Sequence, residues 1–215
     1  MISRSRLAAL IPTALIAIVL CPQTAAAAGG SSFVATKGTV SIAFNAGVLA
    51  SFQALGIEFN SGTGHAVAPS AAYPRLSIVP AAAQPLHAPR TPLNTARPAG
   101  VVYIGEATVS FYQQLSASNT QGGIEFPEVV FGAHPALEGE YVYTHTGANE
   151  VSGNTLSPLF LLNTRHIRPV LRGNTLTLSK IPMTLAPAAL PFFSLFGPGF
   201  TSGEPVGTLT IKAER

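Results

Sequence analysis

Polar and apolar side chains alternate in short stretches along most of the chain. Residues 39–44, 139–145 and 175–179 alternate with period two, as half-buried strands do. Many such segments, separated by turns, are typical of an antiparallel β-sandwich or barrel. The other segments with an extended pattern are 57–59, 76–79, 101–112, 124–131, 156–162, 167–171 and 207–211.

Turn-forming residues separate these segments. Glycine, asparagine and threonine gather at 60–64, 119–123 and 147–154, and Arg172-Gly173-Asn174 joins two late strands. These stretches predict turns. Pro127 lies inside an extended segment and predicts an edge strand or a bulge, because proline cannot donate to a ladder.

Two short apolar segments have helical spacing instead. Asn45 is a typical N-cap, apolar residues follow from 48 to 55, and Gly56 stands where a glycine ends a helix. The second segment, 187–196, opens with a proline and is followed by Gly197. The chain is therefore predicted to be mainly β, with two short apolar capping helices.

Five prolines stand between Pro80 and Pro98. Proline at this density blocks both helix and central strand, so we expect a long surface loop at about 80–98. A linker between domains is the alternative. The segment before it is short for an independent domain, and the length favours one β domain over 29–215.

The first residues have the order of a secretion signal. Arg4 and Arg6 precede an apolar run from 7 to 20, and small residues lead to Ala28. This order predicts a signal peptide over 1–28, cleaved near Ala28. A spanning helix needs about 20 apolar residues, so the run is short for a membrane anchor.

A lipoprotein is another interpretation of the same segment. It would use Cys21, but Val19 and Leu20 are bulky where small residues are expected. We therefore expect a secreted or cell-surface protein with no transmembrane segment in the mature chain. Because Cys21 is the chain's one cysteine, the mature part would fold without a disulfide.

The charge balance changes once the signal peptide is removed. Ten basic residues then face nine glutamates, so the mature net charge is close to zero and nucleic acid is not a predicted partner. The partners that remain are a cell-envelope component or another exported protein.

The residue types exclude several catalytic classes. The chain has no aspartate, which excludes an EF-hand and a Ser-His-Asp triad as such. No HExxH, Gly-x-Ser-x-Gly or phosphate-binding glycine motif occurs. Glu125 with Glu128, and Glu138 with Glu140, are carboxylate pairs, but sequence neighbours on strands seldom give glycosidase geometry. We predict a non-enzymatic protein, with a secreted hydrolase as an alternative.

Two groups of side chains are candidate binding sites. Tyr141, Tyr143 and His145 fall two residues apart on a predicted strand, so a regular strand would place them on one face. Tyrosinate and imidazole are iron and haem ligands. An aromatic stripe on a strand also occurs without any ligand, so both interpretations stay open.

The second group is basic. It consists of Arg165, His166, Arg168 and Arg172. Guanidinium groups pair well with carboxylates, so Arg165 and Arg168 are candidates for binding an acidic polymer or a haem propionate. Solvated charges at strand ends are the alternative interpretation.

The C-terminal stretch resembles a known group of proteins. Residues 176–186 lead into an apolar helix, and Phe200-Thr201-Ser202-Gly203-Glu204-Pro205-Val206-Gly207-Thr208 leads into the last strand. This is similar to the closing segment of secreted actinobacterial β proteins. The segment 48–57, which ends Leu-Gly-Ile, resembles their opening helix. The group is distantly similar to the HtaA-type haem-uptake domain.

The resemblance implies an exported β protein and makes haem a candidate cofactor. Many relatives carry a His, small, Gly-Gly, Leu run on a middle strand, whereas this chain has Val102-Tyr103-Ile104-Gly105-Glu106-Ala107. We therefore expect surface binding or adhesion, with a haem- or iron-binding module as the alternative.

Overall fold

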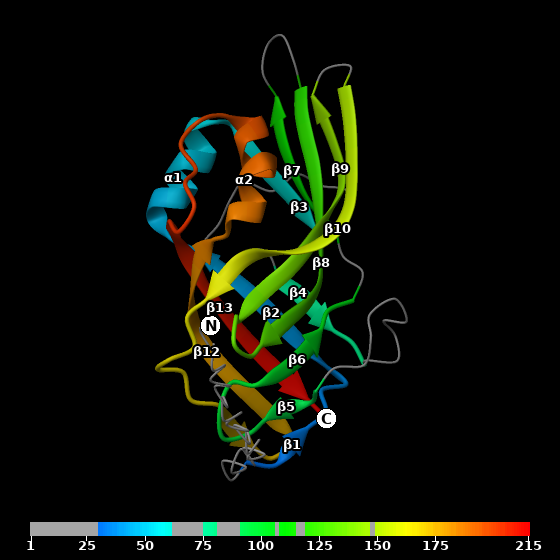
Figure 1. Cartoon of the computed structure of the whole chain (residues 1–215), viewed down its shortest axis with the longest axis vertical. Coiled ribbons are helices and arrows are strands. Elements are labelled where there is room, and N and C mark those ends of the chain that lie inside the picture. Colours follow the sequence, from blue (N-terminus) through cyan, green and yellow to red (C-terminus); the bar gives the residue numbers. More distant parts are fainter. Residues whose placement is uncertain (1–29, 62–74, 81–90, 106–107, 115–118, 147–148) are drawn as a thin grey trace, which may run out of the picture.

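The structure of the protein is a computed structural model, and it confirms a mainly β antiparallel fold with short helices (Figure 1). The expected signal peptide and the residues 81–90 of the proline-rich segment lie outside the described residues. The residues that the structure describes are 30–61, 75–80, 91–105, 108–114, 119–146 and 149–215.

Eleven strands form one antiparallel sheet, and β1 (Ser32–Phe33) pairs separately with β5 (Leu93–Asn94). This short pair places the buried Leu93 within the segment expected to be a loop. The sheet strands are β2 (Lys37–Phe44), β3 (Ile57–Ser61), β4 (Arg75–Ile78), β6 (Gly100–Tyr103), β7 (Thr108–Gln114), β8 (Asn119–Phe131), β9 (Ala136–Thr146), β10 (Asn149–Leu162), β11 (Val170–Arg172), β12 (Thr175–Leu185) and β13 (Pro205–Glu214).

The lower part of the molecule is a barrel-like ring of strands. The order is β8-β9-β10-β12-β13-β2-β4, and β6 pairs with β8. The ring closes between β4 and β6 by a bridge from Ile78 to Ile104. Val79 N donates to Tyr103 O at 3.1 Å, and Gly105 N donates to Ser77 O at 2.9 Å. These two hydrogen bonds join the ends of β4 and β6 on either side of the bridge.

The upper part is a lobe built on the other half of β8. β7 pairs with β8 from Asn119 to Glu125, and β6 pairs with it from Glu128 to Phe131. Residues 101–112 are therefore not one long strand as expected, because β6 and β7 pair with different halves of β8. The β8–β9 register shifts between Glu125 and Glu128, which confirms the bulge predicted at Pro127.

One predicted turn is wrong and another extends too far along the chain. Residues 119–123 begin β8, and residues 149–154 begin β10, so both belong to the lobe. A glycine stands at position 122 in β8 because the Phe192 ring packs directly against its backbone. A Cβ there would lie 2.5 Å from Cε2 of Phe192.

Helix α1 (Ala46–Ala54) has the ends that the sequence predicts. The Asn45 side chain accepts from Val48 N at 2.8 Å and caps the first turn. Gly56 follows the helix with φ 64°, a conformation that glycine adopts freely. Val48 and Phe52 are its buried residues.

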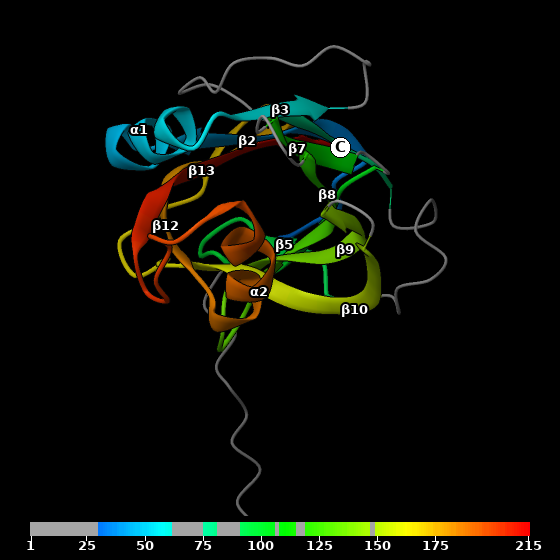
Figure 2. The ribbon, with the colours of Figure 1, turned by 90° about the horizontal axis from the view of Figure 1, so that it is seen from above.

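The second predicted helix is a run of three short pieces that ends at Gly197, as expected. These are η2 (Pro187–Ala189), α2 (Leu190–Phe193) and η3 (Ser194–Phe196). Seen from above, this run lies over the opening enclosed by the strands, while α1 lies at the periphery (Figure 2). Both helical segments therefore lie at the same end of the molecule (Figure 1).

Aromatic rings fill the space between the helices and the lobe. Phe192 stands within 5.5 Å, centroid to centroid, of Phe111, Phe193, Phe196 and Tyr141. T-shaped and offset ring pairs of this kind stabilise a core beyond the area that they bury. The fold is thus held at this end by packing of aromatic side chains from distant segments.

One buried amide ties the two helical segments together. Gln113 on β7 is 3 % exposed. Its Nε2 donates to the carbonyl of Leu55, at the end of α1, and to the carbonyl of Phe196, at the end of η3. A single side chain therefore satisfies the carbonyls of two helix ends.

The two segments that carry the sequence resemblance meet in space. Asn45, which caps α1, also donates from Nδ2 to Pro205 O, and its own N–H donates to Val206 O at 2.9 Å. Gly203 donates to Leu185 O at 2.8 Å and has φ 81°. The closing segment is thus held by hydrogen bonds to the N-cap of α1 and to the end of β12.

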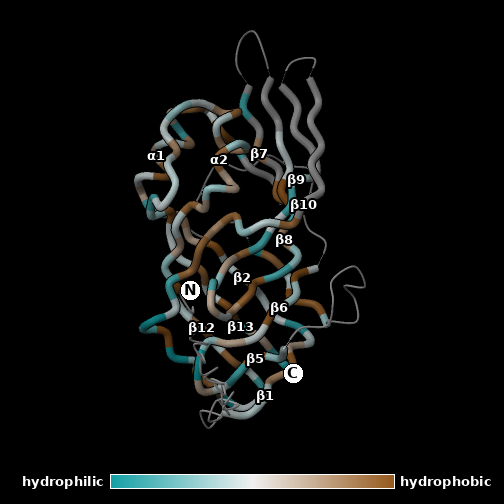
Figure 3. Tube along the Cα trace, viewed as in Figure 1, coloured by the Kyte–Doolittle hydropathy of each residue, from teal (hydrophilic) through white to brown (hydrophobic). Residues whose placement is uncertain are grey.

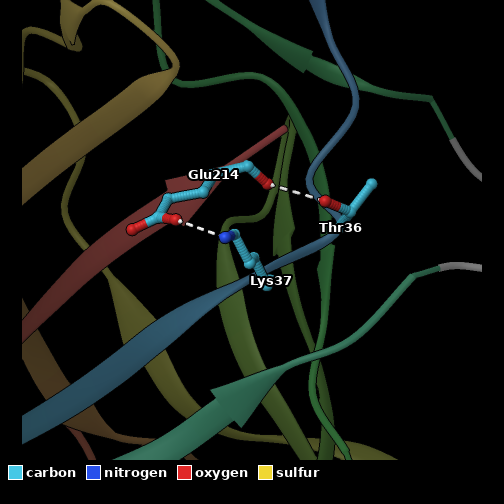
Figure 4. Close-up of polar contacts among 3 residues, drawn as sticks. All are labelled: Thr36, Lys37 and Glu214. Atoms are coloured by element: carbon cyan, nitrogen blue, oxygen red, sulfur yellow. Dashed lines mark hydrogen bonds and ion pairs between the residues drawn. The ribbon is translucent and has the colours of Figure 1, made fainter.

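The last strand is also tied to β2 at its far end (Figure 4). Thr36 Oγ1 donates to the Glu214 carbonyl at 3.3 Å, and Lys37 Nζ lies 3.2 Å from Glu214 Oε2. Both charged side chains are largely exposed, so the ion pair adds about 1 kcal/mol or less.

In the part of the chain that the structure describes, no helix is long and apolar enough to cross a membrane.

Candidate functional site

An open groove of about 530 Å³ lies on the outer wall of the barrel. Its floor is the outward face of β10 and β12, where Leu161 pairs with Thr184. The turn between β8 and β9, with Gly132, Ala133 and Pro135, forms one wall, and residues 162–165 form the other. The volume lies in the range of small-ligand sites.

Local sequence explains why these side chains face outward. In β10 and β12 the neighbours of Leu161 and Thr184 are buried, and strand side chains alternate between faces. Leu161 is therefore left 39 % exposed on the wall of the barrel. A single exposed leucine is ordinary on a protein surface, and Leu161 differs in forming the floor of a groove.

Hydrogen bonds fix the backbone around the groove. Leu162 N donates to Pro135 O and Asn163 N to Pro182 O, both at 2.9 Å. Arg165 N donates to Asn163 Oδ1 at 3.2 Å, which shapes the turn that carries the arginine. The walls of the groove are thus tied to each other and to β12.

Arg165 supplies the positive charge of the groove. Its side chain is exposed, and within the described part of the chain its guanidinium makes no hydrogen bond or ion pair. The segment after β10 projects from the barrel and is hydrophilic (Figure 3). A guanidinium in this position can bind a carboxylate or phosphate with two parallel hydrogen bonds.

The rest of the predicted basic cluster does not line the groove. Arg168 is exposed, and its Nη1 reaches only the neighbouring Ile167 O at 3.4 Å. Arg172 ends β11, whose three residues are all exposed. Of the two arginines proposed for binding, Arg165 lines the groove and Arg168 does not.

Tyr141 has a structural role in the lobe. Its ring stacks on Phe192 with centroids 5.2 Å apart and an interplanar angle of 7°. Its hydroxyl donates to Ala188 O in η2. Burial raises the pKa of Tyr141 to about 12. The ring contact with Phe192 and the hydrogen bond to Ala188 therefore account for Tyr141 without a ligand.

The Tyr141→Phe variant is expected to lose about 0.5–1.5 kcal/mol of stability at neutral pH, because the hydrogen bond to Ala188 is lost. The raised pKa of Tyr141 has a second effect. Above pH 10 the unfolded tyrosine loses its proton first, so the stability that the group contributes declines as pH rises from about 10 to about 12.

Urea unfolding at pH 8 and pH 11 measures both effects. The wild type should lose more stability than Tyr141→Phe between these two pH values, since the other titrating groups are common to both proteins. Equal losses would contradict the assignment of Tyr141 as a buried, protonated anchor.

The alternation that would align Tyr141 with Tyr143 and His145 is interrupted. Ile124 pairs with Tyr141, but Gly123 pairs with Tyr143, so β9 has one extra residue between them. The pairing with β10 shifts at the same point, between Val151 and Gly153. A one-residue insertion of this kind is a β-bulge. The side chains of Tyr143 and His145 lie outside the described residues.

The predicted glutamate pairs are rearranged by the strand register. Glu125 pairs with Glu140, and Glu128 pairs with Glu138, across β8 and β9. Glu128 is fully buried, so a substrate in solvent does not reach it. Among the described residues, no group of three His, Cys, Asp or Glu could hold a metal ion.

Sequence reasoning missed most of the groove. Leu161 and Thr184 lie on different strands, and Pro135 on a turn, so no local motif joins them. One signal was present, since residues 159–162 are all apolar and a strand cannot turn four successive side chains to one face. Which residues lie opposite them depends on strand pairing.

The described residues form an antiparallel barrel with a helix-covered lobe. The structure is similar to the crystal structure of the C-terminal domain of HtaA from Corynebacterium glutamicum, with a TM-score of 0.53 and 14 % identity over 85 % of this chain and 99 % of that chain. No family model and no curated protein matches the chain. The distant similarity to the HtaA-type domain is confirmed, and at this identity it concerns the fold.

Proposed function

We propose that this chain is an exported, non-catalytic binding module that attaches to a cell-envelope component through the groove at Arg165. The observation that carries the proposal is the exposed guanidinium of Arg165 above a groove whose backbone is fixed by hydrogen bonds. The sequence features of a signal peptide support export. The HtaA-like fold is compatible with a surface role.

The Arg165→Gln variant tests the proposal. Wild-type protein is expected to sediment with the envelope fraction of its host, and Arg165→Gln is expected to bind about fivefold more weakly, because a partly exposed ion pair contributes about 1 kcal/mol. Raising the salt from about 0.05 to about 0.5 M should weaken binding of the wild type by roughly a similar factor, because salt screens exposed charges.

Arg75→Gln is the matched control, since Arg75 is exposed on β4 and does not line the groove. This variant should sediment like the wild type. Equal retention of Arg165→Gln and Arg75→Gln would count against the groove as the attachment site.

A second candidate function is haem or iron binding, favoured by the fold similarity to HtaA. Tyr143 and His145 are the residues proposed for it, since Tyr141 is held in the lobe by Phe192 and Ala188. Adding haemin should then shift the Soret band, and Tyr143→Phe should weaken the shift while Tyr141→Phe retains it. An unshifted spectrum at micromolar protein would remove this candidate.

A further inference from the structure

We propose that the groove at Arg165 binds a small amphipathic anion, with one carboxylate or phosphate against Arg165 and an aliphatic chain along Leu161. This inference rests on the proposed function and specifies its ligand.

The charge of the groove selects an anion. Arg165 is the charged residue among the described lining residues, and none of them is a glutamate. The backbone N–H of Arg165 donates to Asn163 Oδ1, whereas its guanidinium makes no hydrogen bond or ion pair within the described residues. The five donors of a guanidinium match the oxygens of a carboxylate or phosphate.

Charge alone does not retain such a ligand. An exposed ion pair changes a binding constant by about fivefold or less. Inorganic phosphate would therefore bind only weakly to Arg165. A ligand that stays bound must also bury apolar surface, and each buried methylene changes the binding constant by about fourfold.

The groove offers this apolar surface next to the charge. Leu161 is 39 % exposed on its floor, and Ala133 and Pro135 stand on the opposite wall. All three side chains are aliphatic, and no aromatic residue is among the described lining residues. The lining therefore favours a flexible aliphatic chain over a planar ring, which needs a stacking partner.

Polar side chains line the groove together with Arg165 and the apolar residues. The hydroxyls of Thr164 and Thr184 line the same groove. Asn163 uses Oδ1 for the Arg165 N–H, which leaves its Nδ2 as a donor. These groups can bind the ligand oxygens that Arg165 does not reach, where the acidic head joins the chain.

The test is a titration of the full chain, followed through the methyl NMR signals of leucine. The probes are octyl phosphate, octanoate, inorganic phosphate and octyl glucoside, each below its micelle concentration. Octyl phosphate or octanoate should shift the Leu161 methyls and saturate, and the stronger of the two identifies the head group. Inorganic phosphate should bind at least about a hundredfold more weakly, since it lacks the chain.

Octyl glucoside has the same chain and no charge, so it should bind about fivefold more weakly than the charged probes. Arg165→Gln should reduce the affinity for the charged probes by about the same factor and leave octyl glucoside unchanged. Arg75→Gln should change neither. Circular dichroism of both variants shows whether each is folded like the wild type.

Equal affinity for octyl phosphate, octanoate and octyl glucoside would overturn the inference, as would shifts at Leu195 with Leu161 unmoved. The two proposals fail separately. Arg165-dependent sedimentation without any Leu161 shift would leave the proposed function and remove this ligand class. If the Leu161 methyls shift but sedimentation does not depend on Arg165, the ligand class stands and the proposed function is removed.

Discussion

The Phe192→Ala variant is expected to lower the free energy of unfolding by about 3–5 kcal/mol, the usual cost of removing a buried phenylalanine. Phe192 is 1 % exposed and touches the rings of Phe111, Phe193, Phe196 and Tyr141. Its loss leaves a cavity where the helical run meets the sheet, and rings from several segments line it.

Urea denaturation followed by circular dichroism measures this loss. Leu195→Ala is the matched control, because Leu195 lies in the same helical run but is 36 % exposed. The control should lose less than about 1 kcal/mol. Similar losses for both variants would mean that the aromatic cluster does not hold the helical run on the lobe.

Gly122 provides a further check on the same contact. Gly122→Ala places a Cβ 2.5 Å from the Phe192 ring, so it should cost about 1–3 kcal/mol on its own. In the Phe192→Ala background that cost should largely disappear, because the ring that it would meet is gone. Additive effects would contradict the direct contact.

The Gly207→Ala variant is expected to destabilise the barrel by about 3 kcal/mol or more, since it combines backbone strain with a clash. Gly207 has φ 154°, and a Cβ there would lie 2.1 Å from Ala43 O. The obstructing atom is backbone in β2, so a rotamer change does not relieve the contact. The β2–β13 ladder would have to separate locally.

Thermal or urea unfolding tests this expectation against Gly132→Ala. Gly132 has open space around its Cβ position and no positive φ, so its variant should stay within about 0.5 kcal/mol of the wild type. An equally small loss for Gly207→Ala would show that the close approach of β2 and β13 is not needed.

Gly207 also helps to explain why the residues from Phe200 to Thr208 resemble those of other proteins. It belongs to the run from Phe200 to Thr208, in which Gly203 closes a turn and the Pro205 carbonyl accepts from Asn45. These are requirements of backbone geometry. The resemblance of this segment to secreted actinobacterial β proteins therefore lies in residues that fix the backbone.

Local patterns were sufficient for much of the fold. The α1 caps at Asn45 and Gly56 and the bulge at Pro127 follow from residue chemistry within a few positions, and the structure confirms them. In β8, the extended segment 124–131 was predicted, but residues 119–123 were taken as a turn because Gly122 and Gly123 are turn-forming residues. The place of Gly122 in the sheet depends on Phe192, which lies 70 residues later in the chain and cannot be seen locally.

The candidate site depended even more on pairing. Arg165 was predicted from its basic neighbours, and the structure places it at the groove. The spacing of Tyr141 and Tyr143 predicted a shared face, but the extra residue of β9 lies between them. A bulge of this kind is set by the neighbouring strands, so period-two spacing alone does not reveal it.

The most direct test of binding at the groove is protection of a single cysteine. Cys21 is the one cysteine, so Cys21→Ser with Thr184→Cys leaves one thiol in the groove. Envelope material should slow its maleimide labelling severalfold, while Ser202→Cys, which is exposed elsewhere, should label at an unchanged rate. Bound protein in which Thr184→Cys labels as fast as free protein would contradict the account.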